Sequence, residues 1–145
     1  MTWVVQERQA EGQLIDLGVV TMRLLVARQQ SNGTLGVAEF TGREGAWTVP
    51  HIHQRMEESF YVLSGQFAFT VGDEEVEVDE GCFVMVPRGT RHLLHCGAEG
   101  GKLLALFTPA GLEEMFLELG RLPADSITNP DVRAAIALRH DSIPA

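Results

Sequence analysis

The chain has 145 residues, of which 45% are hydrophobic and 21% charged, as expected for one globular domain rather than a disordered chain. Its formal net charge of -9, with the basic residues scattered, disfavours binding to nucleic acid or to an anionic membrane surface. No stretch reaches the length of a membrane span, and the N-terminus lacks a basic region followed by an apolar one, so we expect a cytoplasmic protein.

Short apolar runs separated by Gly, Asp, Asn and Pro occupy the chain from residue 13 to residue 106. Runs of this length with frequent turn signals indicate an antiparallel sandwich or barrel, and the 15 glycines suit its tight turns. The expected strands include Val19–Ala27, Leu35–Thr41, Glu58–Leu63, Gln66–Val71, Glu74–Val78, Cys82–Val86 and Lys102–Phe107.

Two turns are predicted within these strands. Gly72-Asp73 separates Gln66–Val71 from Glu74–Val78, as a two-residue hairpin turn requires. Ser64-Gly65-Gln66 is predicted to reverse the chain just before that hairpin. In Glu74–Val78 the valines alternate with acidic residues, so we expect one face in the core and one solvated acidic face.

Beyond residue 107 the pattern becomes helical. Thr108-Pro109 is predicted to be an N-cap followed by proline at the first helical position. Apolar residues at helical spacing, including Met115 and Phe116, should pack this helix onto the outside of the barrel. Asn129-Pro130-Asp131 is predicted to start a second helix. We expect one domain over 1–145, with N-terminal strands in 1–34, the barrel in 35–108 and helices in 109–145.

Three of the five histidines belong to two spaced patterns. In the first, His51 and His53 are two residues apart, and side chains two apart on a strand point to the same face. Glu58 opens the next strand and shares a face with Phe60 and Val62. A carboxylate on an otherwise apolar inward face is costly unless a cation pairs with it.

The second pattern runs from Gly81 through the turn Pro87-Arg88-Gly89 to His92. Together the two patterns offer three neutral nitrogens and one charged oxygen. Such a set suits one divalent transition metal, Fe, Mn, Ni, Co or Zn, and leaves one or two positions for substrate, water or dioxygen. The metal ligands that we predict are His51, His53, Glu58 and His92.

Other nearby side chains are weighed against this set. Glu57 also follows the first two histidines, but on a strand it faces away from Phe60 and Val62, so Glu58 is preferred. His95 should face outward, three residues past His92. His140 is expected at a helix C-terminus, where the helix dipole favours it.

The first pattern runs from Gly45 through His51, His53 and Glu58 to Gly65, and together the two patterns resemble the two sequence motifs of the cupin superfamily. The resemblance implies an all-β double-stranded β-helix, an antiparallel jelly-roll barrel, here followed by two C-terminal α-helices. It also implies that the four predicted ligands bind the metal. Where the second motif usually ends in Asn, this chain has Cys96, which we interpret as a buried thiol rather than a thiolate ligand. The layout is nearest to small-molecule cupins, which include quercetinase-like dioxygenases.

The function implied is a metal-dependent dioxygenase or related oxidoreductase that acts on a small enolic or phenolic substrate. Glu58 would double as general base. Alternatives are a non-redox isomerase, cyclase or lyase, and a binding protein without turnover. Candidates for an apolar substrate pocket are Phe40, Trp47, Phe60, Phe67, Phe69 and Cys96.

Assembly is predicted by analogy with cupins, which commonly pair by sheet packing or by exchange of N-terminal strands. The apolar segment Trp3-Val4-Val5 suits such an exchange, and it equally suits a short strand that folds back on its own barrel. We expect a homodimer.

Overall fold

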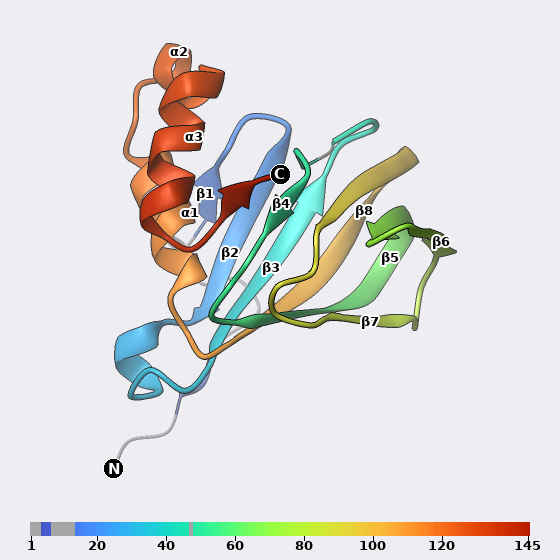
Figure 1. Ribbon diagram of the computed structural model, residues 1–145, viewed down its shortest axis with the longest axis horizontal. Coiled ribbons are helices and arrows are strands. Elements are labelled where there is room, and N and C mark those ends of the chain that lie inside the picture. The colour runs from blue at the N-terminus through green and yellow to red at the C-terminus, as the bar shows by residue number, and fades with distance from the viewer. Residues whose placement is uncertain (1–3, 7–13, 47) are drawn as a thin grey trace.

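Antiparallel pairing joins the strands into one strongly bent sheet in the computed structural model, which describes residues 4–6, 14–46 and 48–145 (Figure 1). The strands are β1 (Leu14–Asp16), β2 (Val20–Val26), β3 (Gly36–Gly42), β4 (His51–Ile52), β5 (Glu57–Val71), β6 (Glu74–Val78), β7 (Phe83–Val86), β8 (His92–Thr108) and β9 (Ile143–Pro144). A short 3-10 helix, Arg28–Gln30, follows β2, and three helices follow β8: α1 (Leu112–Gly120), α2 (Ala124–Ile127) and α3 (Pro130–Arg139).

The long strands β5 and β8 form the centre of the sheet. They pair from Glu57 opposite Thr108 to Val71 opposite His92, with two register shifts on the way. The first half of β5 also pairs with β7, and its second half pairs with β6. The later part of β8 pairs with β3 and its first residue with β4. Because both long strands bend, the sheet folds over on itself in the antiparallel jelly-roll manner, which confirms the predicted fold class.

The predicted reversal at Ser64-Gly65-Gln66 is wrong, because β5 continues without interruption through this segment. The register with β8 instead shifts between Val62 and Ser64 and between Gly65 and Phe67, which marks β-bulges. Gly65 has a φ of +77°, and a Cβ there would collide with the carbonyl oxygen of Gly100. A glycine at positive φ suits a bulge as well as a turn, so the strand bends here without reversing.

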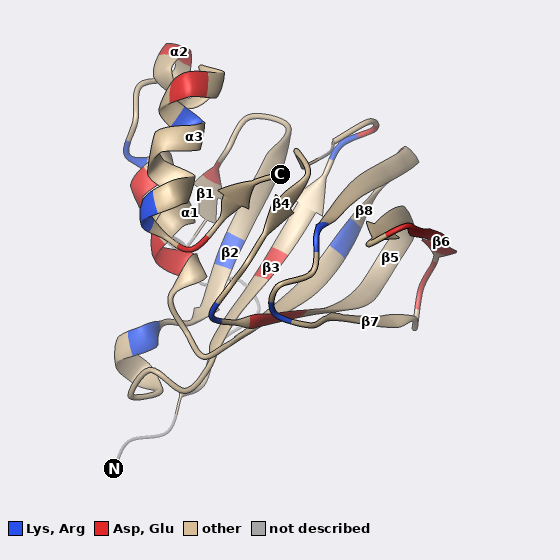
Figure 2. Cartoon of the chain, in the orientation of Figure 1, with Lys and Arg blue, Asp and Glu red and all other residues tan. Residues whose placement is uncertain are grey.

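The predicted hairpin at Gly72-Asp73 is confirmed, since Val71 pairs with Glu74 across the turn. The acidic side chains of β6 are exposed and form the red strand at the right of Figure 2. Within β6 only Val78 packs against the core, whereas Val76 is 47% exposed. The reason is that β6 pairs only with β5, so its inward face is covered less than that of a central strand.

The core lies on the inward face of the bent sheet, where residues opposite each other in register point to the same side. Phe60 lies opposite Ala105, which lies opposite Ala38, and this row is at most 2% exposed. Other inward side chains that are at most 4% exposed are Met22, Val62, Phe67, Phe69, Val86, Leu103 and Phe107. Burial of these side chains supplies the main stabilisation of the fold.

The two predicted helices are present, but the start of the first was predicted wrongly. Thr108 is the last residue of β8 and pairs with Glu57, so it is not an N-cap. The Thr108-Pro109 peptide is cis, and α1 begins at Leu112, with Gly111 as its N-cap. The start of α3 is as predicted: the Asn129 side chain accepts hydrogen bonds from the backbone N–H groups of Asp131 and Val132. The short helix α2 was not predicted.

The helices cover the side of the sheet where its end strands β1 and β9 leave it open (Figure 1). Helix α1 contacts β1 and β3, and α3 contacts α1 and β9. Phe116 of α1 packs edge-on against Phe40, with 4.9 Å between ring centroids, and lies 6.4 Å from Phe107. Both partners point inward, so α1 packs on the inward face of the sheet. The predicted packing on the outside of the barrel is wrong. Among the described helices, none is long and apolar enough to cross a membrane.

Replacing Gly65 with alanine tests the bulge. Gly65→Ala and Gly81→Ala should both lose about 1–2 kcal/mol of unfolding free energy, because both glycines have positive φ. Only Gly65→Ala also forces a Cβ against the Gly100 carbonyl, whereas the space around Gly81 is open. We therefore expect Gly65→Ala to lose about 2 kcal/mol more in urea titrations. Equal losses would contradict this account of the bulge.

Candidate metal centre

Four buried side chains from three parts of the sheet converge on one point: His51 of β4, His53 just after it, Glu58 of β5 and His92 of β8. We call them the ligand group. Each offers one nitrogen or oxygen, and these atoms all lie within 4.8 Å of one another. Their exposed fractions are only 9%, 3%, 8% and 1% in the same order. The four predicted ligands are therefore brought together.

Strand pairing explains why these residues meet. His51 lies directly opposite His92 across the β4–β8 pair, and their ring centroids are 4.2 Å apart. His53 shares the face of His51, as its spacing predicted, with ring centroids at 4.7 Å. Glu58 points inward like Phe60, its neighbour two residues along β5. The site thus depends on the register of β4, β5 and β8.

Each histidine has a carbonyl oxygen near its Nδ1 atom. His51 Nδ1 lies 2.7 Å from the Val49 oxygen, and His92 Nδ1 lies 2.9 Å from the Thr90 oxygen. His53 Nδ1 lies 2.8 Å from the oxygen of Asp141. A carbonyl only accepts hydrogen bonds, so each Nδ1 carries the hydrogen and donates it. Each Nε2 then has a lone pair available for a metal.

The group leaves buried polar atoms without partners. Among the described residues, Nε2 of His53, Nε2 of His92 and Oε2 of Glu58 have no hydrogen bond of acceptable geometry. Nevertheless His53 Nε2 and Glu58 Oε2 are only 2.7 Å apart, and His92 Nε2 is 3.9 Å from the same oxygen. Buried polar atoms without partners are costly, and a cation among them would satisfy all three. The residues present fit a divalent metal.

The charge states of the group also suit a metal. Burial lowers the pKa of His51 to about 4, so this imidazole is neutral at neutral pH. Burial alone would also lower the pKa of His53, but the adjoining carboxylate of Glu58 outweighs it and raises that pKa. Burial alone would raise the pKa of Glu58, but His53 and His92 outweigh it and lower that pKa. Glu58 is therefore ionised, and a metal would displace any proton held at His53.

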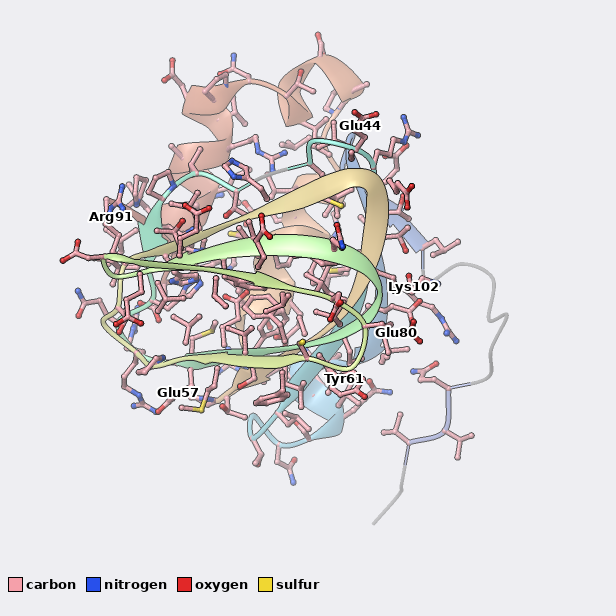
Figure 3. All side chains as sticks on the ribbon, turned by 90° about the vertical axis from the view of Figure 1, so that its right-hand side faces the viewer. Glu44, Glu57, Tyr61, Glu80, Arg91 and Lys102 are labelled. Carbon is pink, nitrogen blue, oxygen red and sulfur yellow. The ribbon has the colours of Figure 1, made fainter. Side chains whose placement is uncertain are left out.

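The side chains that the sequence analysis rejected as metal ligands lie outside the ligand group. Glu57 points away from it and accepts a hydrogen bond from Arg88 Nη2 at 2.6 Å, at the periphery of the strands in Figure 3. His95 is exposed, as predicted. His140 is the C-cap of α3, as predicted, and its Nε2 lies 2.7 Å from Oε2 of Glu118.

Cys96 is a buried thiol, as interpreted from the sequence. It lies opposite Phe67 on the inward face, is 6% exposed, and its Sγ is 3.8 Å from the Gly42 oxygen. Burial raises the pKa of this thiol, which keeps it protonated. It does not belong to the ligand group.

The candidate pocket residues occupy different parts of the inward face. Phe60 and Phe69 are buried side by side, with ring centroids 5.1 Å apart, and Phe40 packs on α1. Phe67 and Cys96 help to line a cleft of about 310 Å³ that none of the ligand group lines. Trp47 lies outside the described residues. A role of these residues in substrate binding stays a prediction.

Sequence reasoning missed Asp141 and strand β9, which reach the ligand group from the end of the chain. The one signal for Asp141 is its place directly after the C-cap of α3, where the helix dipole disfavours a carboxylate. The hydrogen-bond donors for such a carboxylate must therefore come from another part of the fold.

Paired substitutions test the ligand group. His51→Ala and His92→Ala should each strip most of the metal from reconstituted protein, whereas His95→Ala should not, because His95 points away. Glu58→Gln should likewise lose metal, and Glu57→Gln should retain it. Metal per chain is measured by elemental analysis, with circular dichroism as the check on folding. Equal metal loss in all variants would refute the assignment.

Known proteins are similar to this chain in sequence and in fold. The family model described as "Cupin domain" matches residues 39–107, a range that contains the whole ligand group. A protein of Bacillus subtilis (strain 168) named quercetin 2,3-dioxygenase is 28% identical over 110 residues, which are 76% of this chain but 33% of that protein. This chain therefore spans about a third of the length of that relative.

Solved structures agree with the fold. An RmlC-like cupin from Shewanella frigidimarina NCIMB 400 is 26% identical, with a TM-score of 0.62 over 72% of this chain and 93% of that one. KdgF from Halomonas sp. has a TM-score of 0.66 over 79% of this chain and 98% of that one, at 17% identity, and shows likeness of fold alone. With the matched motifs and the jelly-roll fold, these comparisons establish that the chain belongs to the cupin superfamily.

Proposed function

We propose that this cupin is a metal-dependent dioxygenase, or a related oxidoreductase, that acts on a small enolic or phenolic substrate. The observation that carries the proposal is the buried ligand group, whose unpartnered atoms face one point. The Bacillus subtilis relative, named quercetin 2,3-dioxygenase, supports this choice of chemistry.

The ligand group would hold one divalent transition metal, Fe, Mn, Ni, Co or Zn. Three neutral imidazoles and one carboxylate leave a divalent ion with net positive charge, which favours an anionic oxygen as a further ligand. When bound, the metal supplies Lewis acidity that lowers the pKa of a substrate hydroxyl and promotes its reaction with dioxygen.

Glu58 would take the proton of the substrate hydroxyl. The neighbouring His53 and His92 hold its pKa below the ordinary value, so the carboxylate is ionised and has a free oxygen lone pair for that proton. His51 and His92 are oriented by backbone carbonyls on their own chain segments, so their rings are set before substrate arrives. Both atoms of dioxygen would enter the organic product. The substrate then supplies all the electrons, and no other reductant is needed.

Oxygen consumption tests the proposal. Metal-loaded protein with quercetin, or with a simple enol or catechol, should consume dioxygen. Glu58→Gln should lower the rate per bound metal by about 10²–10⁴-fold, because the general base is lost. Glu57→Gln should retain the rate, since Glu57 points outward.

Turnover at the same rate without oxygen would overturn the dioxygenase assignment in favour of an isomerase or cyclase. Binding of these compounds without turnover would overturn it in favour of a binding protein.

We also propose that two copies of the chain pair through the outward face of β5 and β7. Tyr61, Phe83 and Met85 are 40%, 59% and 54% exposed there, and Tyr61 lies directly opposite Phe83. Figure 3 labels Tyr61 at the periphery of the strands. Contiguous exposed apolar side chains of this kind are typical of an interface. The segment 3–5 stays a second candidate: Val5 is 66% exposed, and Trp3 lies outside the described residues.

The charge around this face supports a second copy as the partner. The ion pairs Glu57–Arg88 and Glu39–Lys102 flank it, with N···O distances of 2.6 and 3.4 Å. The charges of these two pairs cancel, whereas the exposed Asp79 and Glu80 precede β7 and the whole chain carries a net charge of -9. Two identical chains of like charge repel each other least where the local charges cancel.

Light scattering after size exclusion measures the mass in solution. We expect twice the 15.9 kDa of one chain for the wild type and one chain mass for Phe83→Lys. Val76→Lys is the matched control, because Val76 is 47% exposed on β6, away from the face. A monomeric wild type, or a Phe83→Lys variant that remains dimeric, contradicts the proposed interface.

A further inference from the structure

The last five residues of the chain fold back along the strand that carries His51. In the β4–β9 pair, Pro144 lies opposite His51 and Ile143 opposite Ile52 (Figure 1). The Ala145 N–H donates to the Pro50 oxygen at 3.0 Å, and Arg91 Nε donates to the Ala145 oxygen at 3.2 Å. The end of the chain is thus fixed against the edge of the metal centre.

Asp141 connects this segment to His53 in two ways. Its backbone oxygen accepts the hydrogen of His53 Nδ1, at 2.8 Å. Its carboxylate accepts hydrogen bonds from the backbone N–H groups of Gln54 and Arg55, at 2.9 and 2.8 Å. The side chain is only 14% exposed, and the φ of Asp141 is +59°, a value that Asp and Asn tolerate better than most residues.

The other two histidines of the ligand group are oriented locally. The carbonyl acceptors of His51 and His92 lie two residues before each ring, whereas the acceptor of His53 lies 88 residues away. The orientation of His53 therefore depends on the docking of a remote segment. The carboxylate of Asp141 ties the two together by holding the backbone directly after His53.

We propose that residues 141–145 form a strap that sets the metal affinity of the site, with Asp141 as the positioning residue for His53. The Nδ1–H···O=C hydrogen bond fixes which nitrogen carries the hydrogen and how the ring is rotated, and such outer contacts tune a metal site strongly. The inference rests on metal binding by the ligand group and is independent of the dioxygenase chemistry.

Cobalt(II) alone is the probe, because its visible absorption reports the coordination of the ion. Its affinity is measured without substrate, by competition with a chelator. Asp141→Ala removes both carboxylate acceptors and disfavours the positive φ, so the affinity should fall roughly 10- to 100-fold with an altered absorption spectrum. Asp141→Gly removes the carboxylate but allows the positive φ at this position. It replaces the alanine variant in the test if that variant does not fold. Asp141→Asn keeps one acceptor oxygen but turns an NH2 donor towards the other backbone N–H, so its affinity should lie between those of the wild type and Asp141→Gly.

Two controls separate positioning from general stability. Asn129→Ala removes the N-cap of α3 and should lower the urea midpoint without changing cobalt affinity. Arg55→Ala removes only an exposed side chain, 3.9 Å from Asp141, and should leave affinity unchanged. The strap is refuted if Asn129→Ala weakens cobalt as much as Asp141→Gly does, or if Asp141→Gly binds cobalt like the wild type. A wild type that binds no cobalt overturns both the strap and the metal site.

Discussion

The buried carboxylate of Glu58 is the constraint on which the rest of the structure depends. An ionised group that is 8% exposed on an apolar sheet face is unstable unless positive charge and donors surround it. Without a metal, the Nε2 atoms of His53 and His92 lie 2.7 and 3.9 Å from the carboxylate, which raises the pKa of His53 against the effect of burial. A divalent cation would displace any proton held at His53 and also satisfy the unpartnered nitrogen of His92. The chain therefore keeps a polar group in its core that a cation satisfies better than its own side chains do.

The bent pair of β5 and β8 makes this arrangement possible. Glu58 stands near the start of β5 and His92 at the start of β8, so the two long strands bring their ligands from opposite ends. A one-residue slip in either strand would turn its ligand outward and expose the core residues beside it. Core packing and metal binding thus select the same register. The bulge near Gly65 contributes to this arrangement, because it bends β5 so that one strand pairs in both halves of the sheet.

The sequence predicted best what local periodicity determines. The alternation around Phe60 and Val62 distinguished Glu58 from Glu57, and the spacing of His51 and His53 placed both imidazoles on one face. Prediction from the sequence failed where one local signal allows two structures. Gly65 permits either a turn or a bulge. Thr108 resembles an N-cap, but its strand pairing with Glu57 keeps it in β8. Strand β9 has two residues and no periodicity, so only its contact with β4 defines it.

The orientation of His53 shows why part of a metal site is absent from any motif. Its acceptor is a backbone carbonyl, which every residue possesses, so residue identity gives no sign of it. Two other features of position 141 favour an Asp there. The backbone has a positive φ, and the carboxylate accepts hydrogen bonds from the backbone N–H groups after His53. Two chains with the same four ligands can therefore hold a metal with different strength when their C-terminal segments dock differently. Affinity at such a site is a property of the tertiary fold, and the ligand motif fixes only which atoms are offered.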